Sequence, residues 1–355
     1  MASANIYVPD NYTTIQQAID NATPWSVIIV KHGGYVENLR INKPLTIKSA
    51  YGAFYTILDG NGGIAIRINS NDVTIEGFTV TNSSQAISIA GGAFNVTIRN
   101  CTLNLGVHGI YFDGGNSNIR IENNKIENIG GYPIRVWFSS NLKILNNTLQ
   151  KNKDLGLYAY SMSYSEIKGN IIKENEKEGI YLLYSENNTI TGNWIEGNLR
   201  GLRLDYSSKN TIYNNYFNNS MNVMLEESSF NGWSITKTYA KNIIGGNYIA
   251  GNVWLDPYKT YRESFSLYCS DSNKDGICDS AYTLGVDNVD YFPIKMSIEP
   301  ETPFTPVPGA IYVPDNYTTI QQAIDNATPW SVIIVKHGGY VENLRINKPL
   351  TIKSA

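Results

Sequence analysis

A short acidic loop around residue 275 carries the side chains best suited to hold a metal ion. Oxygen-bearing side chains stand at its positions 1, 3, 5 and 9, glycine at position 6 and a usable backbone carbonyl at position 7: Asp271, Asn273, Asp275, Asp279, Gly276 and Ile277. This spacing is typical of the first part of an EF-hand calcium loop, although the glutamate of position 12 is missing. We expect a structural Ca²⁺ held by Asp271, Asn273, Asp275, Ile277 and Asp279, with Asp287 or Asp290 completing its shell. A solvated turn without metal is the alternative.

Two cysteines lie at this loop. Cys269 and Cys278 are close in sequence and could form a disulfide, which would leave Cys101 single. Three cysteines are too few for a disulfide framework. The bridge and the ion would together have a structural role, fastening one end of the fold.

A second set of chemically capable residues recurs at intervals of about 23 positions. It consists of Tyr111, Arg135, Trp137, Tyr158, Tyr160, Tyr181, Arg203 and Asp205. Aromatic rings stack on sugar rings, while arginine and aspartate side chains form hydrogen bonds with hydroxyl groups. We therefore expect a carbohydrate-binding face. The alternative is that tyrosine is frequent here because it favours exposed strand positions.

Catalysis has only three candidate residues, Asp113, Arg135 and Asp205. If successive periods lie one strand spacing apart, Asp113 and Asp205 are four strands and about 19 Å apart. That distance is too large for two carboxylates that must flank one glycosidic bond. The sequence therefore favours a non-enzymatic protein, and leaves a polysaccharide lyase or glycoside hydrolase as the alternative.

Three series of apolar residues repeat with the same period of 21 to 24 residues. They are Ile75, Ile98, Ile121, Ile144, Ile167, Ile190 and Ile212; Ile87, Ile110, Ile134, Leu157, Ile180, Leu202 and Val223; and Val80, Leu103, Ile126, Leu149, Ile172, Ile195 and Phe217. Three short strands per period, in register between periods, predict an all-β, right-handed parallel β-helix. Ile244 is expected to continue the first series. A leucine-rich horseshoe is excluded, because its consensus and its helical segments are absent.

An asparagine follows the first series by three residues and marks a turn. The predicted ladder is Asn124, Asn147, Asn170, Asn193, Asn215 and Asn247. Asparagine tolerates left-handed backbone, and stacked amides can satisfy one another from coil to coil. These residues are therefore expected to be structural. Asn11, Asn82 and Asn95 also match the N-glycosylation acceptor pattern.

The two ends of the chain share one sequence, since residues 6–50 recur unchanged as 311–355. A capping box at 13–16 predicts a short helix that covers the open end of the coil stack. We divide the chain into 1–5 (an expression start), 6–60 (cap helix and first coil), 61–250 (β-helix) and 251–298 (C-terminal segment with the calcium-type loop). A Pro-rich linker at 299–310 and the repeated cap at 311–355 follow. This cap could dock on the open C-terminal edge of its own coil stack or on that of a neighbouring copy of the same module.

The N-terminal motif Val8-Pro-Asp-Asn-Tyr-Thr-Thr-Ile-Gln-Gln-Ala-Ile19, with Gly34-Tyr-Val-Glu-Asn38 and Lys43-Pro-Leu-Thr-Ile47, resembles the entry segment of pectin-lyase-like β-helix proteins. The asparagine-rich coils and the ending Asp275-Gly-Ile-Cys-Asp279 and Asp290-Tyr-Phe-Pro293 are similar to the NosD-like and CASH (carbohydrate-binding and sugar hydrolase) group. This resemblance covers nearly the whole of 6–298 and implies the fold more than an activity. NosD is linked to copper maturation, but no Met/His/Cys cluster here supports that role.

The composition limits the classes of partner that the chain could bind. The net charge is −3 without a basic run, which argues against nucleic acid, and no stretch of 18 apolar residues could span a membrane. We expect an extracellular or cell-surface module of a tandem-repeat protein, both structural and glycan-binding. It would assemble head to tail into filaments or envelope layers.

Overall fold

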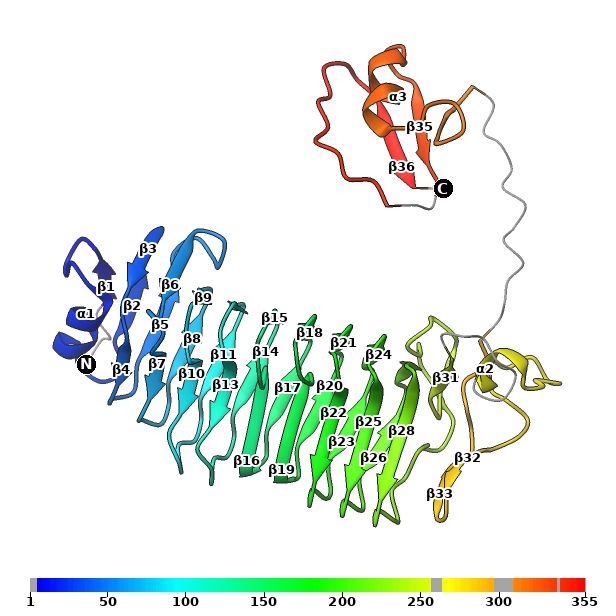
Figure 1. Ribbon diagram of the computed structural model, residues 1–355, viewed down its shortest axis with the longest axis horizontal. Helices are drawn as coiled ribbons and strands as arrows, with labels where there is room; N and C mark the ends of the chain where they lie inside the picture. Colours follow the sequence, from blue (N-terminus) through cyan, green and yellow to red (C-terminus); the bar gives the residue numbers. More distant parts are fainter. Residues whose placement is uncertain (1–4, 257–263, 297–308, 337–338, 355) are drawn as a thin grey trace. The chain divides into compact units, whose positions relative to one another are not determined.

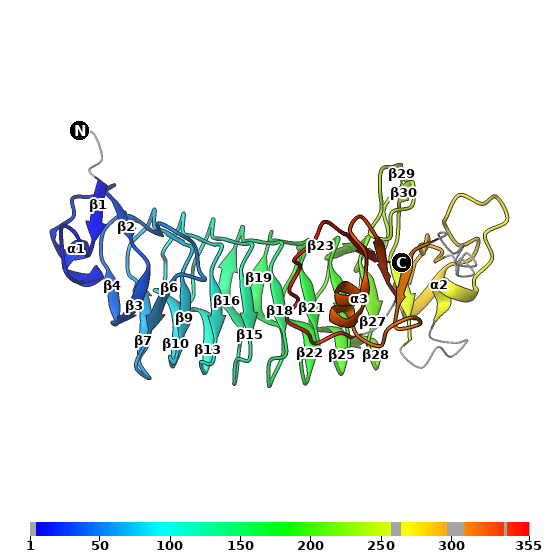
Figure 2. The ribbon, with the colours of Figure 1, turned by 90° about the horizontal axis from the view of Figure 1, so that it is seen from above.

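The computed structural model describes residues 5–256, 264–296, 309–336 and 339–354, which belong to two compact units, 1–297 and 298–355. The first unit is a parallel β-helix, a stack of coils that each contribute one strand to each of three sheets (Figures 1 and 2). The predicted fold class is confirmed. Corner residues such as Asn118 and Asn141 have left-handed backbone, with φ of 52° and 55°, which turns the chain between strands.

The three sheets are labelled A, B and C. Sheet A contains β1 (Asn5–Val8), β2 (Val27–Val30), β5 (Thr46–Ser49), β8 (Thr74–Glu76), β11 (Thr97–Arg99), β14 (Arg120–Glu122), β17 (Lys143–Leu145), β20 (Glu166–Lys168), β23 (Thr189–Thr191) and β26 (Thr211–Tyr213). Sheet B contains β3 (Gly33–Val36), β6 (Thr56–Asp59), β9 (Thr79–Thr81), β12 (Thr102–Asn104), β15 (Lys125–Glu127), β18 (Thr148–Gln150), β21 (Ile171–Lys173), β24 (Trp194–Glu196), β27 (Tyr216–Asn218) and β31 (Val253–Leu255). Sheet C contains β4 (Leu39–Ile41), β7 (Ile64–Ile68), β10 (Gln85–Ile89), β13 (His108–Phe112), β16 (Ile134–Ser140), β19 (Leu157–Ser163), β22 (Glu178–Leu183), β25 (Arg200–Asp205) and β28 (Met221–Glu226).

The three apolar series are the core. Ile98 pairs with Ile75 on one side and Ile121 on the other, and the same register holds through sheets B and C. The side chains of these residues are almost entirely buried, apart from the half-buried Val223 at the last strand of sheet C. Because a single coil cannot bury its apolar side, stacking supplies the hydrophobic stabilisation.

The asparagine ladder forms as predicted except at its end. Asn147 Oδ1 accepts hydrogen bonds from Asn124 N and Nδ2, at 2.9 and 3.0 Å, and the pattern continues coil by coil to Asn215. Asn215 then donates to Asn252, at 3.1 and 3.0 Å, so the prediction of Asn247 is wrong. The inserted residues form a hairpin of β29 (Thr238–Tyr239) and β30 (Tyr248–Ile249), whose length the sequence period does not reveal. The expected Ile244 lies in this insertion, outside the three sheets.

The N-terminal end is closed by α1 (Ile15–Asn21), which buries Ile15, Ala18 and Ile19. The helix was predicted, but its cap lies one residue later: Thr14 accepts from Gln17 N at 3.1 Å. The Glu37 carboxylate accepts from Ile15 N and from Gln16 N, each at 2.9 Å. These bonds satisfy N–H groups that a helix leaves free at its start.

At the other end, α2 (Phe265–Tyr268) and a hairpin of β32 (Tyr282–Gly285) and β33 (Asn288–Asp290) follow the last coil. Trp233 and Trp254 are fully buried beneath them. Asp290 ends the asparagine ladder: its Oδ2 accepts from Asn252 N and Trp254 Nε1, both at 2.8 Å.

The second unit contains β34 (Ile311–Val313), α3 (Ile320–Asn326), β35 (Val332–Val335) and β36 (Thr351–Ser354). Its three strands pair in one parallel sheet. It repeats the arrangement of β1, α1, β2 and β5, as identical sequence requires. The predicted linker at 299–310 lies outside the described residues except for 309–310, and so does the predicted start at 1–5 except for Asn5. Nowhere in the described parts of the chain is a helix both long and apolar enough to cross a membrane.

Candidate functional site: an aromatic band on sheet C

The outer face of sheet C carries the predicted sugar-binding residues in register. We define the aromatic band as Tyr111, Arg135, Trp137, Tyr158, Tyr160, Tyr181, Arg203 and Asp205. Tyr158 pairs with Arg135 and Tyr181 in one column, and Tyr160 pairs with Trp137 in the next. Strand neighbours lie about 4.8 Å apart, so the side chains of one column touch. All members are half-buried except Asp205, which is buried.

The rings and two guanidinium groups form a strip, in which the Arg203 guanidinium carbon lies 4.6 Å from the Tyr181 ring centroid. The Arg135 guanidinium carbon lies 4.3 Å from the ring centroids of both Tyr111 and Trp137. Trp137 stacks on Tyr160 with centroids 4.3 Å apart and planes 18° from parallel. Tyr158 contacts Tyr181 at 5.3 Å. Rings that brace one another in this way are rigid, so little side-chain entropy is lost when a ligand stacks on them.

Two neighbouring residues, His108 and Tyr132, widen the aromatic band on the side where the strands of sheet C begin. His108 stacks on Tyr132 at 5.5 Å, and Tyr132 stacks on Tyr158 at 5.3 Å. His108 Nδ1 accepts from Tyr132 N at 3.0 Å, while burial and the charge of Arg135 lower the pKa of the imidazole. Our sequence reasoning did not assign Tyr132 to the site. Its signal was available, because His108 and Tyr132 are each two residues before a member of the second apolar series.

The aromatic band carries charged groups on β25, at the end of the band nearest the last coil. Arg203 binds Asp205 at 2.6 Å, and Tyr181 Oη donates to Asp205 Oδ2 at 2.7 Å. Burial, followed by this hydrogen bond to Asp205, raises the pKa of Tyr181. Asp205 is only 3% exposed, so it holds Tyr181 and Arg203 in place instead of meeting a ligand directly. The buried Glu178 likewise pairs with Arg200 at 2.7 Å.

A surface hollow of about 320 Å³ opens between these two parts of the aromatic band. It is lined by Tyr132, Asp154, Leu155, Tyr158, Lys177, Glu178, Tyr181, Arg200 and Arg203. Aromatic walls with charged groups at the rim suit a polar ligand that has flat apolar faces, as sugars do.

The two carboxylates among the catalytic candidates, Asp113 and Asp205, do not meet. Asp113 follows β13 and pairs with Arg67 at 2.8 Å, whereas Asp205 ends β25. β16, β19 and β22 lie between them in the sheet. The two carboxylates therefore cannot act on one bond, as the sequence period indicated.

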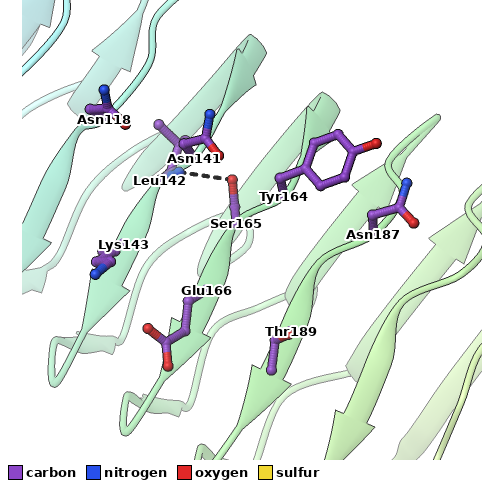
Figure 3. A pocket seen from close by; sticks show the side chains of 9 residues that line it. All are labelled: Asn118, Asn141, Leu142, Lys143, Tyr164, Ser165, Glu166, Asn187 and Thr189. Carbon is purple, nitrogen blue, oxygen red and sulfur yellow. Dashed lines mark hydrogen bonds between the residues drawn. The ribbon is translucent and has the colours of Figure 1, made fainter.

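A second depression, the polar groove, lies along the corner between sheets C and A. Figure 3 shows the side chains that line it, from neighbouring coils. Its volume is about 510 Å³ and its lining is Asn118, Asn141, Leu142, Lys143, Tyr164, Ser165, Glu166, Asn187 and Thr189. Only Tyr164 is aromatic, so the groove lacks the stacked rings of the aromatic band.

The family model described as periplasmic copper-binding protein (NosD) matches residues 45–259, which is more than half of the chain. The chain belongs to the NosD family. The whole aromatic band lies within the matched residues.

One curated relative is a cell surface glycoprotein of Methanothermus fervidus, 38% identical over 78 residues. The match covers 21% of this NosD-family chain and 13% of that protein, so most of the relative has no counterpart here.

Solved structures share the fold. The enzymatically active domain of tailspike protein 2 from bacteriophage CBA120 has a TM-score of 0.53 and 13% identity, covering 70% of this chain and 45% of its own. Pectate lyase Pel9A has a TM-score of 0.50 and 13% identity, covering 66% and 80%. At this identity the likeness extends to the β-helix alone.

The described residues do not fit the copper site that the family description implies. Among them, no three His, Cys, Asp or Glu side chains gather closely enough to hold a metal ion. Cys101 is buried, and burial raises the pKa of its thiol to about 11, which disfavours the thiolate that binds metals.

In the acidic loop of this NosD-family protein, the carboxylates accept hydrogen bonds from backbone N–H groups of the same loop. Asp271 accepts from Asp275 N at 3.1 Å and from Gly276 N at 2.9 Å, and Asp279 accepts from Ser272 N at 2.9 Å. Lys237 contacts the Asp275 carboxylate, so a bound cation would have to displace this amine. Cys269 and Cys278 are joined by a disulfide at the loop. The calcium ligands remain a prediction.

Proposed function

We propose that this NosD-family chain is an extracellular, cell-surface module that binds polysaccharide along the aromatic band. The observation that supports this is the continuous, half-buried strip of stacked rings on one face of sheet C. A polysaccharide has a long repeating surface, and a β-helix presents its side chains at a matching constant spacing. The partial match to a cell surface glycoprotein supports the location.

Affinity electrophoresis against a panel of neutral and acidic polysaccharides tests the proposal. We expect retardation by at least one polymer, and a loss of about tenfold or more in affinity for Trp137→Ala and Tyr160→Ala, since aromatic anchors dominate such surfaces. Tyr239→Ala is the control, because Tyr239 is equally aromatic, 77% exposed and lies in the β29–β30 hairpin. No retardation by any polymer would overturn the proposal.

One observation favours a polysaccharide lyase as the second candidate. His108 has a lowered pKa and lies with Tyr132, Tyr158 and Arg135, so a neutral imidazole stands beside phenol and guanidinium groups. Such groups can take and return a proton. Release of unsaturated sugars from a uronan, abolished in His108→Ala, would support catalysis, and binding without product would refute it.

We also propose that residues 311–355 bind a neighbouring copy of the module. In the first unit Leu39 and Ile41 are 1% and 0% exposed because β7 covers them. The identical residues of the second unit, Leu344 and Ile346, are 41% and 57% exposed. Exposed apolar residues of this kind are suited to pack against a coil of another copy.

A further inference from the structure

Arg135 differs from the other arginines around the aromatic band. Arg67 pairs with Asp113, Arg200 with Glu178 and Arg203 with Asp205, at 2.8, 2.7 and 2.6 Å. For Arg135, the described residues provide no carboxylate within 4.0 Å. Its only hydrogen bond with described residues is a long one, from Nη1 to Phe112 O at 3.4 Å.

Other carboxylates of sheet C are bound to other groups. Arg67 reaches across the small Ser88, to which it donates at 3.2 Å, and binds Asp113, which lies two residues after Tyr111 in sequence. Asp205 is held by Arg203 and Tyr181. The positive charge of Arg135 therefore stays uncompensated on a half-buried surface, where a charge interacts more strongly than in water.

Aromatic rings hold the Arg135 side chain in place. The Tyr111 and Trp137 ring centroids each lie 4.3 Å from the guanidinium carbon, and among the described residues only Phe112 O accepts a hydrogen bond from the group. A planar fork of N–H donors matches the two oxygens of a carboxylate. The rings of Tyr158 and Tyr160, one strand further along, lie next to this position.

We propose that Arg135 binds the carboxylate of a uronic acid residue in an acidic polysaccharide, while the rings of Tyr158 and Tyr160 carry sugar rings of the same chain. This inference rests on the proposed function, because it names the charged subsite within the aromatic band. It adds a substrate class, uronic-acid polymers, and one residue that selects it.

Isothermal titration of the full chain with two forms of one polymer tests the inference. Polygalacturonate has free carboxylates, whereas its methyl ester has the same backbone with the charge removed. We expect the wild-type chain to bind polygalacturonate about tenfold or more tightly than the ester. Arg135→Gln should bind both forms with the affinity that wild type has for the ester. Arg99→Gln is the matched control, because Arg99 lies on β11 of sheet A and its loss changes the charge equally. Circular dichroism shows whether each variant is folded.

Each other outcome has a distinct meaning. Equal affinity for acid and ester, or a preference unchanged in Arg135→Gln, overturns the inference and leaves polysaccharide binding intact. Tighter binding to dextran sulfate than to polygalacturonate overturns the assignment to carboxylates. If the chain binds none of these polymers and no neutral polymer either, the proposed function itself is overturned.

Discussion

At the scale of single residues, buried asparagines form hydrogen bonds with backbone groups that apolar side chains cannot form. Each ladder amide accepts from the preceding coil and donates to the next and to a backbone carbonyl, as Asn170 does to Asn193 Oδ1 and Ile144 O, both at 2.9 Å. The tight corner leaves backbone N–H groups inside the coil, and an unpaired buried group costs free energy. The ladder removes that cost at every coil.

Asn170→Ala should therefore lower the free energy of unfolding by about 2–5 kcal/mol, since it leaves several buried polar groups without partners. Urea denaturation followed by circular dichroism measures this change. Lys168→Ala, at an exposed site on β20, should change stability by about 0.5 kcal/mol or less. Equal effects of the two substitutions would show that the ladder is not a source of stability.

The end of the ladder makes stability depend on pH. Burial raises the pKa of Asp290 to about 7, above its ordinary value of 3.8, although four N–H donors oppose the shift. The folded state then holds the proton more tightly than the unfolded state, so stability should fall as the pH rises from about 4 to about 7. In Asp290→Asn that fall should shrink because the amide carries no charge, although its single oxygen can replace only Oδ2 and the bond from Phe292 N to Oδ1 is lost. Thermal unfolding from pH 4 to pH 8 measures both proteins, and a variant whose stability falls with pH as much as that of wild type would contradict the shift.

The acidic loop gives a metal-dependent prediction. If Asp271, Asn273 and Asp275 hold Ca²⁺, millimolar calcium should raise the unfolding temperature, because a ligand that binds only the folded state stabilises it. Asp271→Asn should weaken this response. Magnesium is the control ion, since it needs a smaller octahedral site. An unfolding temperature indifferent to calcium would leave a solvated turn, with Lys237 as the partner of Asp275.

At the scale of elements, the duplicated segment provides an internal comparison. α1 and α3 have the same caps, from Thr14 and Thr319, because capping is local. Strand burial is not local, since β4 is covered by β7. Identical sequence therefore gives identical helices but different environments for the apolar residues that follow.

The pair Ile41 and Ile346 tests this difference. Ile41→Ala removes a fully buried side chain and should cost about 2–5 kcal/mol in the unfolding of the first unit, whereas Ile346→Ala should cost about 0.5 kcal/mol or less in the second. Hydrogen exchange of the full chain, read by mass spectrometry, resolves the two units. If both substitutions cost the same, Ile346 is buried in solution.

At the scale of the whole molecule, the β-helix converts a sequence period into a surface with constant spacing. This property serves both proposed interactions, because a polysaccharide and a neighbouring copy are themselves repeating partners. The proposed contact between copies has a direct consequence. Sedimentation velocity should show association that grows with concentration and is lost in Ile346→Asp. Val36→Asp, at a residue that is 68% exposed in the first unit, should leave association unchanged. A full chain that stays monomeric at all concentrations would refute the contact.

Much of this protein follows from the sequence alone. The period of the isoleucine series determines the coils, the three sheets and the residues of the aromatic band, because inward and outward positions alternate along each strand. The cap helix follows from its local motif. The sequence could not place Asn252, since nothing in an insertion reveals how long its hairpin is.

The pairing of charges was decided only by the tertiary structure. Arg67, Arg135 and Arg203 occupy the same column of sheet C, and the sequence offers no reason to distinguish them. Whether each meets a carboxylate depends on side chains from neighbouring coils, such as the small Ser88 that lets Arg67 reach Asp113. Contacts between coils lie about 23 residues apart in the chain, and their geometry is set by packing. For that reason the sequence showed where the site lies, and the fold showed which of its arginines lacks a carboxylate partner among the described residues.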